Sequence, residues 1–172
     1  MSQPLLEVSD LCVEFGSEAK PVRVLDRMSL HLHPGEILGI VGESGCGKSM
    51  TSLAILRLVP SPPGRITEGS ICLSGEDLLA VSNRRMQDIR GKDIAMIFQE
   101  PMTALNPVFT IGQQIIETIR RHEPMNKAQA RQQALELIDA VRIPDPEKRL
   151  DQYPHELSGG MRQRAMIALA LA

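Results

Sequence analysis

The stretch ILGIVGESGCGKS at residues 37–49 decides the fold of this chain. Its first part, residues 37–41, is a continuous apolar run, which is typical of a strand buried in the middle of a sheet. Its second part is rich in glycine, and helical spacing begins at Lys48 and continues to about Leu58. The predicted order is therefore strand, glycine loop and helix, with any chemistry at the C-terminal end of the strand.

The glycine-rich part, residues 42–49, fits the phosphate-binding pattern GxxxxGK[ST]. Glycines let the backbone curl so that its N–H groups face an anion, and the helix N-terminus adds a partial positive charge. Lys48 would reach the β- and γ-phosphates of a nucleotide, and the Ser49 hydroxyl would be a ligand of Mg²⁺. The pattern predicts a P-loop nucleotide-binding protein, a class that includes many GTPases, kinases and motors.

The composition limits the kind of protein this chain can be, but it does not identify the function. With 172 residues and 42% hydrophobic residues, the chain fits one globular domain. A net charge of -2 gives no basic field, so nucleic-acid binding is not expected. Cys12, Cys46 and Cys72 form no CxxC pair and are expected to be reduced thiols. The first residues lack the basic start and apolar run of a secretory signal, so export is not expected. The apolar runs are far shorter than the ~20 residues of a membrane helix, so we expect any membrane role to be peripheral.

The first half also predicts regular elements around the loop. Partial alternation of apolar residues indicates an antiparallel pair of strands, residues 6–15 and 24–32. Further predictions are a strand near Ile71, a short polar helix at residues 83–89 and a strand at residues 94–98.

The second half is predicted to be mainly helical. Residues 99–107 contain two prolines and are expected to form a surface loop. Helical spacing follows at residues 110–122 and 126–141, with Asn126 as N-cap. A connector containing prolines at residues 144–154 leads to a helix that begins at Ser158.

A second motif, LSGGM at residues 157–161, opens that last helix. Ser158, Gly159 and Gly160 would form another exposed helix N-terminus able to bind an anion, or simply a flexible helix start with a serine cap. Gln99 stands between the two motifs, at the end of a predicted strand. In this order the three features resemble the P-loop, Q-loop and signature of the ABC ATPases.

That resemblance implies an α/β fold: a P-loop NTPase core with an N-terminal antiparallel β subdomain and an α-helical signature subdomain, incomplete at the C-terminus. The core with both loops would occupy residues 1–108 and the helical subdomain residues 109–165. Two such domains would dimerise head to tail, with ATP between the P-loop of one and the signature of the other. Lys48 and Gln99 are the implied catalytic residues, and Ser49 and Gln99 the implied Mg²⁺ ligands. The implied nucleotide contacts are Gly42, Glu43, Ser44, Gly45, Cys46, Gly47, Lys48, Ser49, Met50, Ser158, Gly159 and Gly160.

The resemblance also gives Phe15 a candidate role. Phe15 precedes the P-loop where the family has an aromatic side chain that stacks on adenine. A phenylalanine in the core of the first strand is the alternative, and the sequence leaves both open.

Two longer stretches resemble one group within the family. FQEPMTALNP at residues 98–107 and YPHELSGGMRQR at residues 153–164 are similar to ATP-binding subunits of dipeptide and oligopeptide importers. Met161 replaces the glutamine of the general signature, which affects side-chain contacts but leaves the backbone N–H groups. The implied partners are a second ATP-binding subunit, two transmembrane permease subunits and, indirectly, a substrate-binding protein, at the cytoplasmic face of the plasma membrane.

The family continues beyond the signature with a Walker B strand ending in Asp-Glu, a D-loop and a switch histidine, and the sequence ends at Ala172 before them. We expect a truncated subunit, in which catalysis by the chain alone is doubtful and unpaired backbone and the apolar residues 166–171 are exposed. Two alternatives remain at this point: a soluble ABC ATPase of DNA repair or translation, and a non-functional remnant.

Overall fold

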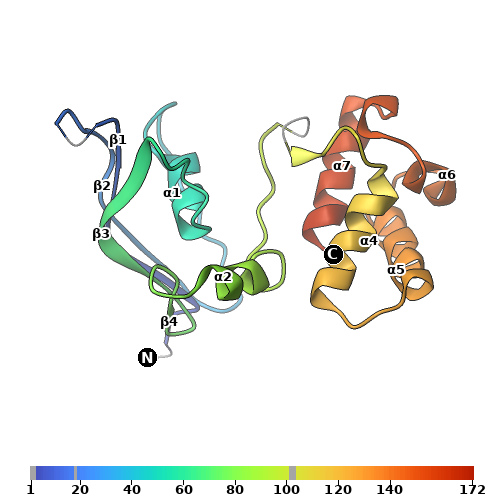
Figure 1. The fold of residues 1–172 in the computed structure, drawn as a ribbon, viewed down its shortest axis with the longest axis horizontal. Helices are drawn as coiled ribbons and strands as arrows, with labels where there is room; N and C mark the ends of the chain where they lie inside the picture. Colours follow the sequence, from blue (N-terminus) through green and yellow to red (C-terminus); the bar gives the residue numbers. More distant parts are fainter. Residues whose placement is uncertain (1–2, 18, 101–103) are drawn as a thin grey trace. The chain divides into compact units, whose positions relative to one another are not determined.

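The computed structural model describes residues 3–17, 19–100 and 104–172. The chain divides into two compact units, one up to residue 87 and one from residue 88 onward (Figure 1). Each unit has its own set of packed elements. The subdomain bounds expected from the family resemblance, residues 1–108 and 109–165, stay a prediction.

The first unit is built on an antiparallel sheet with the strand order β2-β1-β3-β4. Its strands are β1 (Leu6–Phe15), β2 (Val22–Leu32), β3 (Gly64–Leu73) and β4 (Glu76–Asp77). The central strand β1 is antiparallel to both β2 and β3, and bulges interrupt its register after Val8 and Ser9. The predicted antiparallel pair and the predicted strand near Ile71 are therefore confirmed.

Helix α1 (Lys48–Ile55) lies beside this sheet in Figure 1. Thr51 and Ala54 are the buried residues of the helix, and at its start Gly47 lies against Leu25 of β2. Removal of apolar side chains such as Leu25 and Ala54 from water stabilises the unit. The helix begins at Lys48, as predicted. It ends at Ile55, three residues before the predicted end at Leu58, because residues 56 and 57 form a turn. The short helix α2 (Asn83–Ile89) has the predicted bounds.

The buried central strand predicted at residues 37–41 is wrong for this structure. These residues have no regular secondary structure, and Ile37 and Val41 are 97% and 93% exposed. A strand interior to a parallel sheet needs a hydrogen-bonding neighbour on each side, and no described strand pairs with this run. Residues 37–41 are apolar, but a strand forms only where its backbone also makes hydrogen bonds to a neighbouring strand.

The strand predicted at residues 94–98 is also not formed. Only an isolated bridge between Arg90 and Ile94 is present, and Ile97 is exposed. The same physical reason applies, because no described strand continues that bridge into a ladder. Part of the loop predicted at residues 99–107 lies outside the described residues, and Leu105 within it is buried.

The second unit is helical, with α4 (Ile111–His122), α5 (Lys127–Ala140), α6 (Pro146–Leu150) and α7 (Gly159–Ala170), and with the 3₁₀ turn η1 (Pro154–Glu156). Thr110 and Asn126 cap α4 and α5 through reciprocal capping boxes, so the predicted N-cap Asn126 is confirmed. A shared apolar core joins the helices: Ile111, Ile115, Ile119, Ala130, Ala134, Ile138, Leu150, Leu157, Ala165 and Ala168.

Two details of this unit differ from the sequence-based expectations. The connector at residues 144–154 contains α6, where Leu150 packs so closely that a Cβ on Gly112 would lie 2.8 Å from its carbonyl oxygen. Of the apolar end that was expected to be exposed, Met166 is buried and Leu171 is 62% exposed. Among the described residues, no helix combines the length and apolar character that crossing a bilayer requires.

Candidate phosphate-binding site

The glycine-rich segment at residues 42–49 is a curled loop that leads into α1. Residues 44 and 45 form a turn, and the backbone N–H of Cys46 donates to the carbonyl of Glu43 at 3.3 Å. Gly45 and Gly47 have φ angles of +86° and +95°, where any residue with a Cβ would be strained. The loop is therefore curled, as a phosphate cradle requires.

Lys48 folds back over this loop. Its Nζ donates to the carbonyl oxygens of Gly42 and Glu43, each at 2.7 Å, and lies 3.4 Å from Sγ of Cys46. The ion pairs recorded among the described residues do not include Lys48. Neutral oxygens hold the ammonium, so its full positive charge is available to an incoming anion.

Gly42 opens the loop beneath this lysine. A Cβ there would lie 2.5 Å from Sγ of Cys46 and 4.0 Å from Nζ of Lys48. Any larger residue at this position would force the Cys46 thiol to move. The residues from Gly42 to Cys46 are exposed, so the backbone of the loop is accessible to a ligand from solvent.

The start of α1 completes the site. Its N-cap, Gly47, has no side chain to accept a hydrogen bond, and the first turn contains no acidic residue. The first N–H groups of a helix have no partner within the helix, so these donors point outward with the positive end of the helix dipole. Ser49 is exposed and Met50 is half-buried in this turn. The arrangement can bind an anion and can present a hydroxyl to a cation bridging that anion.

A Mg²⁺ ion at this loop would not have a ready-made protein cage. The described residues contain no group of three or more His, Cys, Asp or Glu side chains able to hold a metal. Mg²⁺ commonly keeps few protein ligands and takes the rest from phosphates and water. The Ser49 hydroxyl fits that donor set, and its role as a ligand stays a prediction.

Phe15 lies at the end of β1, opposite Gly64 of β3 and Val22 of β2. The residue is half-buried, and a Cβ on Gly64 would lie 2.9 Å from its Cζ. The ring thus packs on the backbone of a glycine, which agrees with the core alternative on one side. Adenine stacking on its remaining surface stays a prediction.

The second predicted anion site lies at the start of α7, in the second unit. Ser158 is its N-cap and accepts a hydrogen bond from the backbone N–H of Met161 at 3.4 Å. Ser158, Gly159 and Gly160 are exposed, and a Cβ on either glycine would meet nothing within 4 Å. The serine cap and an open helix terminus therefore coexist, and both interpretations of the motif fit this geometry.

Arg162 secures this helix start, a role that the sequence did not predict. Its Nε donates to the carbonyl of Pro154 at 2.7 Å, and its Nη2 donates to the carbonyl of His155 at 3.3 Å. In the same turn the Glu156 carboxylate accepts from the N–H of Tyr153 at 2.7 Å. The only signal in the sequence was an arginine four positions after the Ser158 cap, which is one helical turn.

Gln99 lies at an exposed bend in the second unit, whereas Ser49 belongs to the first. The proposed contact of Gln99 with Mg²⁺ and the attacking water stays a prediction.

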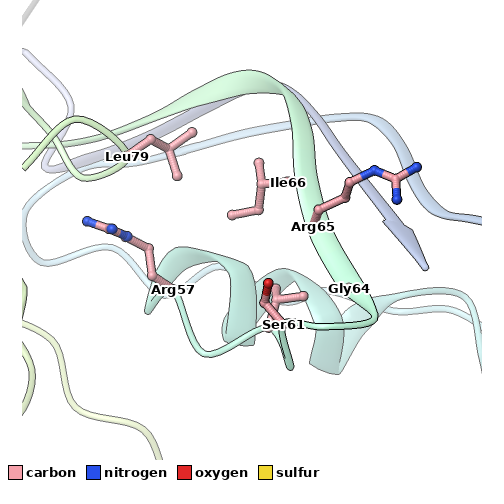
Figure 2. Close-up of a pocket in the computed structure, with 7 residues that line it drawn as sticks. Arg57, Ser61, Gly64, Arg65, Ile66 and Leu79 are labelled. Carbon is pink, nitrogen blue, oxygen red and sulfur yellow. The ribbon is translucent and has the colours of Figure 1, made fainter. Parts of the chain in front are cut away.

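A separate pocket of about 320 Å³ lies in the first unit, between the C-terminal end of α1 and β3 (Figure 2). Ile66 and Leu79 lie between two arginines whose guanidinium groups point away from each other. Arg57 donates to the carbonyl of Val81 at 2.7 Å, and Arg65 donates to the Glu14 carboxylate at 3.0 Å. Both arginines have structural partners, and none of the predicted site residues lines the pocket.

Comparison with known proteins gives one family. The sequence profile of the family described as "ABC transporter" matches residues 25–172. This range includes both loops, Gln99 and α7.

Curated relatives match nearly the whole chain. A probable peptide ABC transporter ATP-binding protein, y4tR of Sinorhizobium fredii, is 53% identical over 98% of this chain and 50% of its own length. The oligopeptide transport ATP-binding protein OppD of Bacillus subtilis is 52% identical over 98% of this chain and 47% of its own length. The dipeptide transport ATP-binding protein DppD of Escherichia coli is 51% identical over 98% and 51%. The chain thus spans about half the length of the curated relatives it matches.

The fold is also that of solved ATP-binding cassettes. A dimeric post-hydrolysis state of the cassette MJ0796 bound to ADP and Pi has a TM-score of 0.84 and 24% identity, over 97% of this chain and 69% of that one. The ATP-binding subunit of an ABC transporter has a TM-score of 0.69 and 25% identity, over 96% and 60%. The predicted fold class, that of an ABC ATPase, is therefore confirmed.

Proposed function

Because the chain belongs to the family of ABC transporters, we propose that it supplies the nucleotide-binding machinery of an ATP-binding subunit whose ATP hydrolysis drives peptide import. The substrate class follows the names of its relatives, which are peptide, oligopeptide and dipeptide transport proteins. These relatives give no reason to favour a soluble ATPase of DNA repair or translation.

The observation that carries the proposal is the curled loop with Lys48 held over it by two carbonyl oxygens. An ATP molecule would present its β- and γ-phosphates to the Lys48 ammonium and to the N–H groups at the start of α1. Gly42 is exposed, and a larger residue there would require Cys46 to shift, because a Cβ would lie 2.5 Å from Cys46 Sγ. Glu43, Ser44, Gly45, Cys46 and Gly47 would line the same cradle, with Met50 following in the first turn.

Bound Mg²⁺ would neutralise charge on the β- and γ-phosphates. In this chain Ser49 would hold it from the first turn of α1, and Gln99 would approach it from the second unit. Phe15 would contact the adenine ring. Hydrolysis is proposed for the whole subunit, because no carboxylate of this chain has been assigned to polarise water.

The exposed start of α7 would act on a second copy or a sister subunit. Ser158, Gly159 and Gly160 present an open helix terminus that can grip the γ-phosphate bound by a partner's loop. Such a sandwich gives ATP binding a way to close the dimer. The further partners are two transmembrane permease subunits and a substrate-binding protein, with this subunit on the cytoplasmic face of the membrane.

Peptide uptake in membrane vesicles tests this function in the complete subunit. Lys48→Ala should abolish ATP-dependent uptake of a labelled dipeptide, because the charge that holds the phosphates is lost. Lys20→Ala, which removes an exposed lysine outside the loop, should leave uptake unchanged. Normal uptake with Lys48→Ala would refute the function of the loop.

A further inference from the structure

Gly47, the last glycine of the loop, is fixed from two sides. Its carbonyl accepts hydrogen bonds from the backbone N–H of Thr51 at 2.9 Å and from the Thr51 hydroxyl at 3.1 Å. On its other side, a Cβ would overlap Cδ2 of Leu25 and would lie 3.3 Å from the carbonyl oxygen of Val24. Strand β2 therefore touches the loop at the residue whose positive φ starts α1.

Leu25 has a position that the sheet determines. It is 4% exposed, and it pairs with Val13 of the central strand β1. A buried side chain in a paired strand has little freedom, and close-packed interiors transmit displacements to their neighbours. The Leu25 methyl group thus sets how far the Gly47 backbone can approach the sheet.

We propose that Leu25 is a positioning residue for the phosphate loop, acting through its contact with Gly47. This inference rests on the proposed nucleotide-binding function. Without the Leu25 side chain, the backbone of Gly47 can sink toward β2, and the directions of the Lys48 side chain and the first N–H groups of α1 change. Binding groups must be held within about 0.5 Å of their productive positions, so their misplacement weakens binding even when every group is present.

The test compares Leu25→Ala with Ile71→Ala in the whole 172-residue chain. Ile71 is fully buried in β3 of the same sheet and pairs with Val8, away from the loop. Calorimetric titration with MgATP should show affinity about tenfold lower for Leu25→Ala than for Ile71→Ala. Leu25→Met, which keeps an apolar group of similar reach, should restore most of the affinity.

A second measurement does not depend on nucleotide. Without ATP, hydrogen exchange of the amides at residues 44–49 should be faster in Leu25→Ala than in Ile71→Ala or the parent chain. If Leu25→Ala fails to fold, Leu25→Val gives the same comparison with a smaller truncation.

Two results would overturn the proposal: equal affinity loss in the Leu25 and Ile71 variants, or loop exchange that Leu25→Ala leaves unchanged. A parent chain without measurable ATP binding would instead refute the proposed function. In that case the exchange experiment still decides whether Leu25 orders the loop.

Discussion

Two helices of this chain begin with glycines at an exposed terminus, and the two termini are built differently. At α1, the N-cap Gly47 has no capping side chain and is fixed by contacts with Leu25 and Thr51. At α7, the N-cap Ser158 bonds to the N–H of Met161, and the glycines after it contact nothing within 4 Å. The first terminus is shaped by tertiary packing, and the second by local sequence.

This difference teaches what each terminus can do alone. The α1 terminus has a curled loop and a lysine on the ligand side, so it can enclose a phosphate within one chain. The α7 terminus is open and one of its N–H groups is already bonded to Ser158, so we expect it to contribute to a site that another surface completes. Four substitutions test this difference between the α1 and α7 termini, and they follow from the largest expected effect to the smallest.

The largest expected effect is at Lys48. Lys48→Ala should lower the affinity of the chain for MgATP about 100-fold, because a charge-assisted contact to two phosphates is lost. Titration calorimetry measures the change, with Lys20→Ala as the control. An affinity within a few-fold of the parent would mean that the α1 terminus does not enclose the phosphates.

Gly47→Ala should be next. It should lower the free energy of unfolding by about 2 kcal/mol, because a Cβ is strained at positive φ and also overlaps Leu25. Gly35→Ala is the matched control, since Gly35 has a φ of +77° but no neighbour within 4 Å of a Cβ. Urea unfolding measures both, and equal losses would show that contact with the sheet has no part in shaping the loop.

Thr51→Val should cost about 1 kcal/mol of stability, because the substitution keeps the shape but removes the hydroxyl bond to Gly47. It should also weaken MgATP binding by a few-fold. Thr118→Val in α4 removes an equivalent bond, to the Gln114 carbonyl at 3.1 Å, far from any proposed phosphate. If both variants weaken ATP binding equally, Thr51 has no special role at the loop.

Ser158→Ala should have the smallest effect. Because its bond to Met161 is long, loss of the cap should cost only about 0.5 kcal/mol. Asn126→Ala, which breaks a capping box with a 3.0 Å bond, should cost more in the same unfolding experiment. The MgATP affinity of the isolated chain should be the same in Ser158→Ala as in the parent. A large loss of affinity would contradict the proposal that the α7 terminus acts on the nucleotide of a second subunit.

Elements that depend on neighbours in sequence were predictable. The spacing of apolar residues and the Asn126 cap gave α4 and α5 close to their bounds, and alternation gave β1 and β2. Residues 37–41 and 94–98 were not predictable in the same way, because a strand exists only where another strand bonds to it. The apolar pattern of each run does not show whether a partner strand exists. Among the described residues, neither run pairs with a strand.

The candidate site also has features that the sequence predicts and features that depend on tertiary packing. The sequence alone determined the residue types of the loop and of the α7 start, because glycines, a lysine and hydroxyls at fixed spacing specify an anion cradle and a helix cap. Only the tertiary structure decided that Leu25 of β2 lies against Gly47. The bonds of Thr51 to Gly47 and of Arg162 to Pro154 join residues at most eight positions apart, so they belong to the local part. Bonds along the chain set local conformation, whereas contacts between distant residues arise only when the sheet and helices have packed.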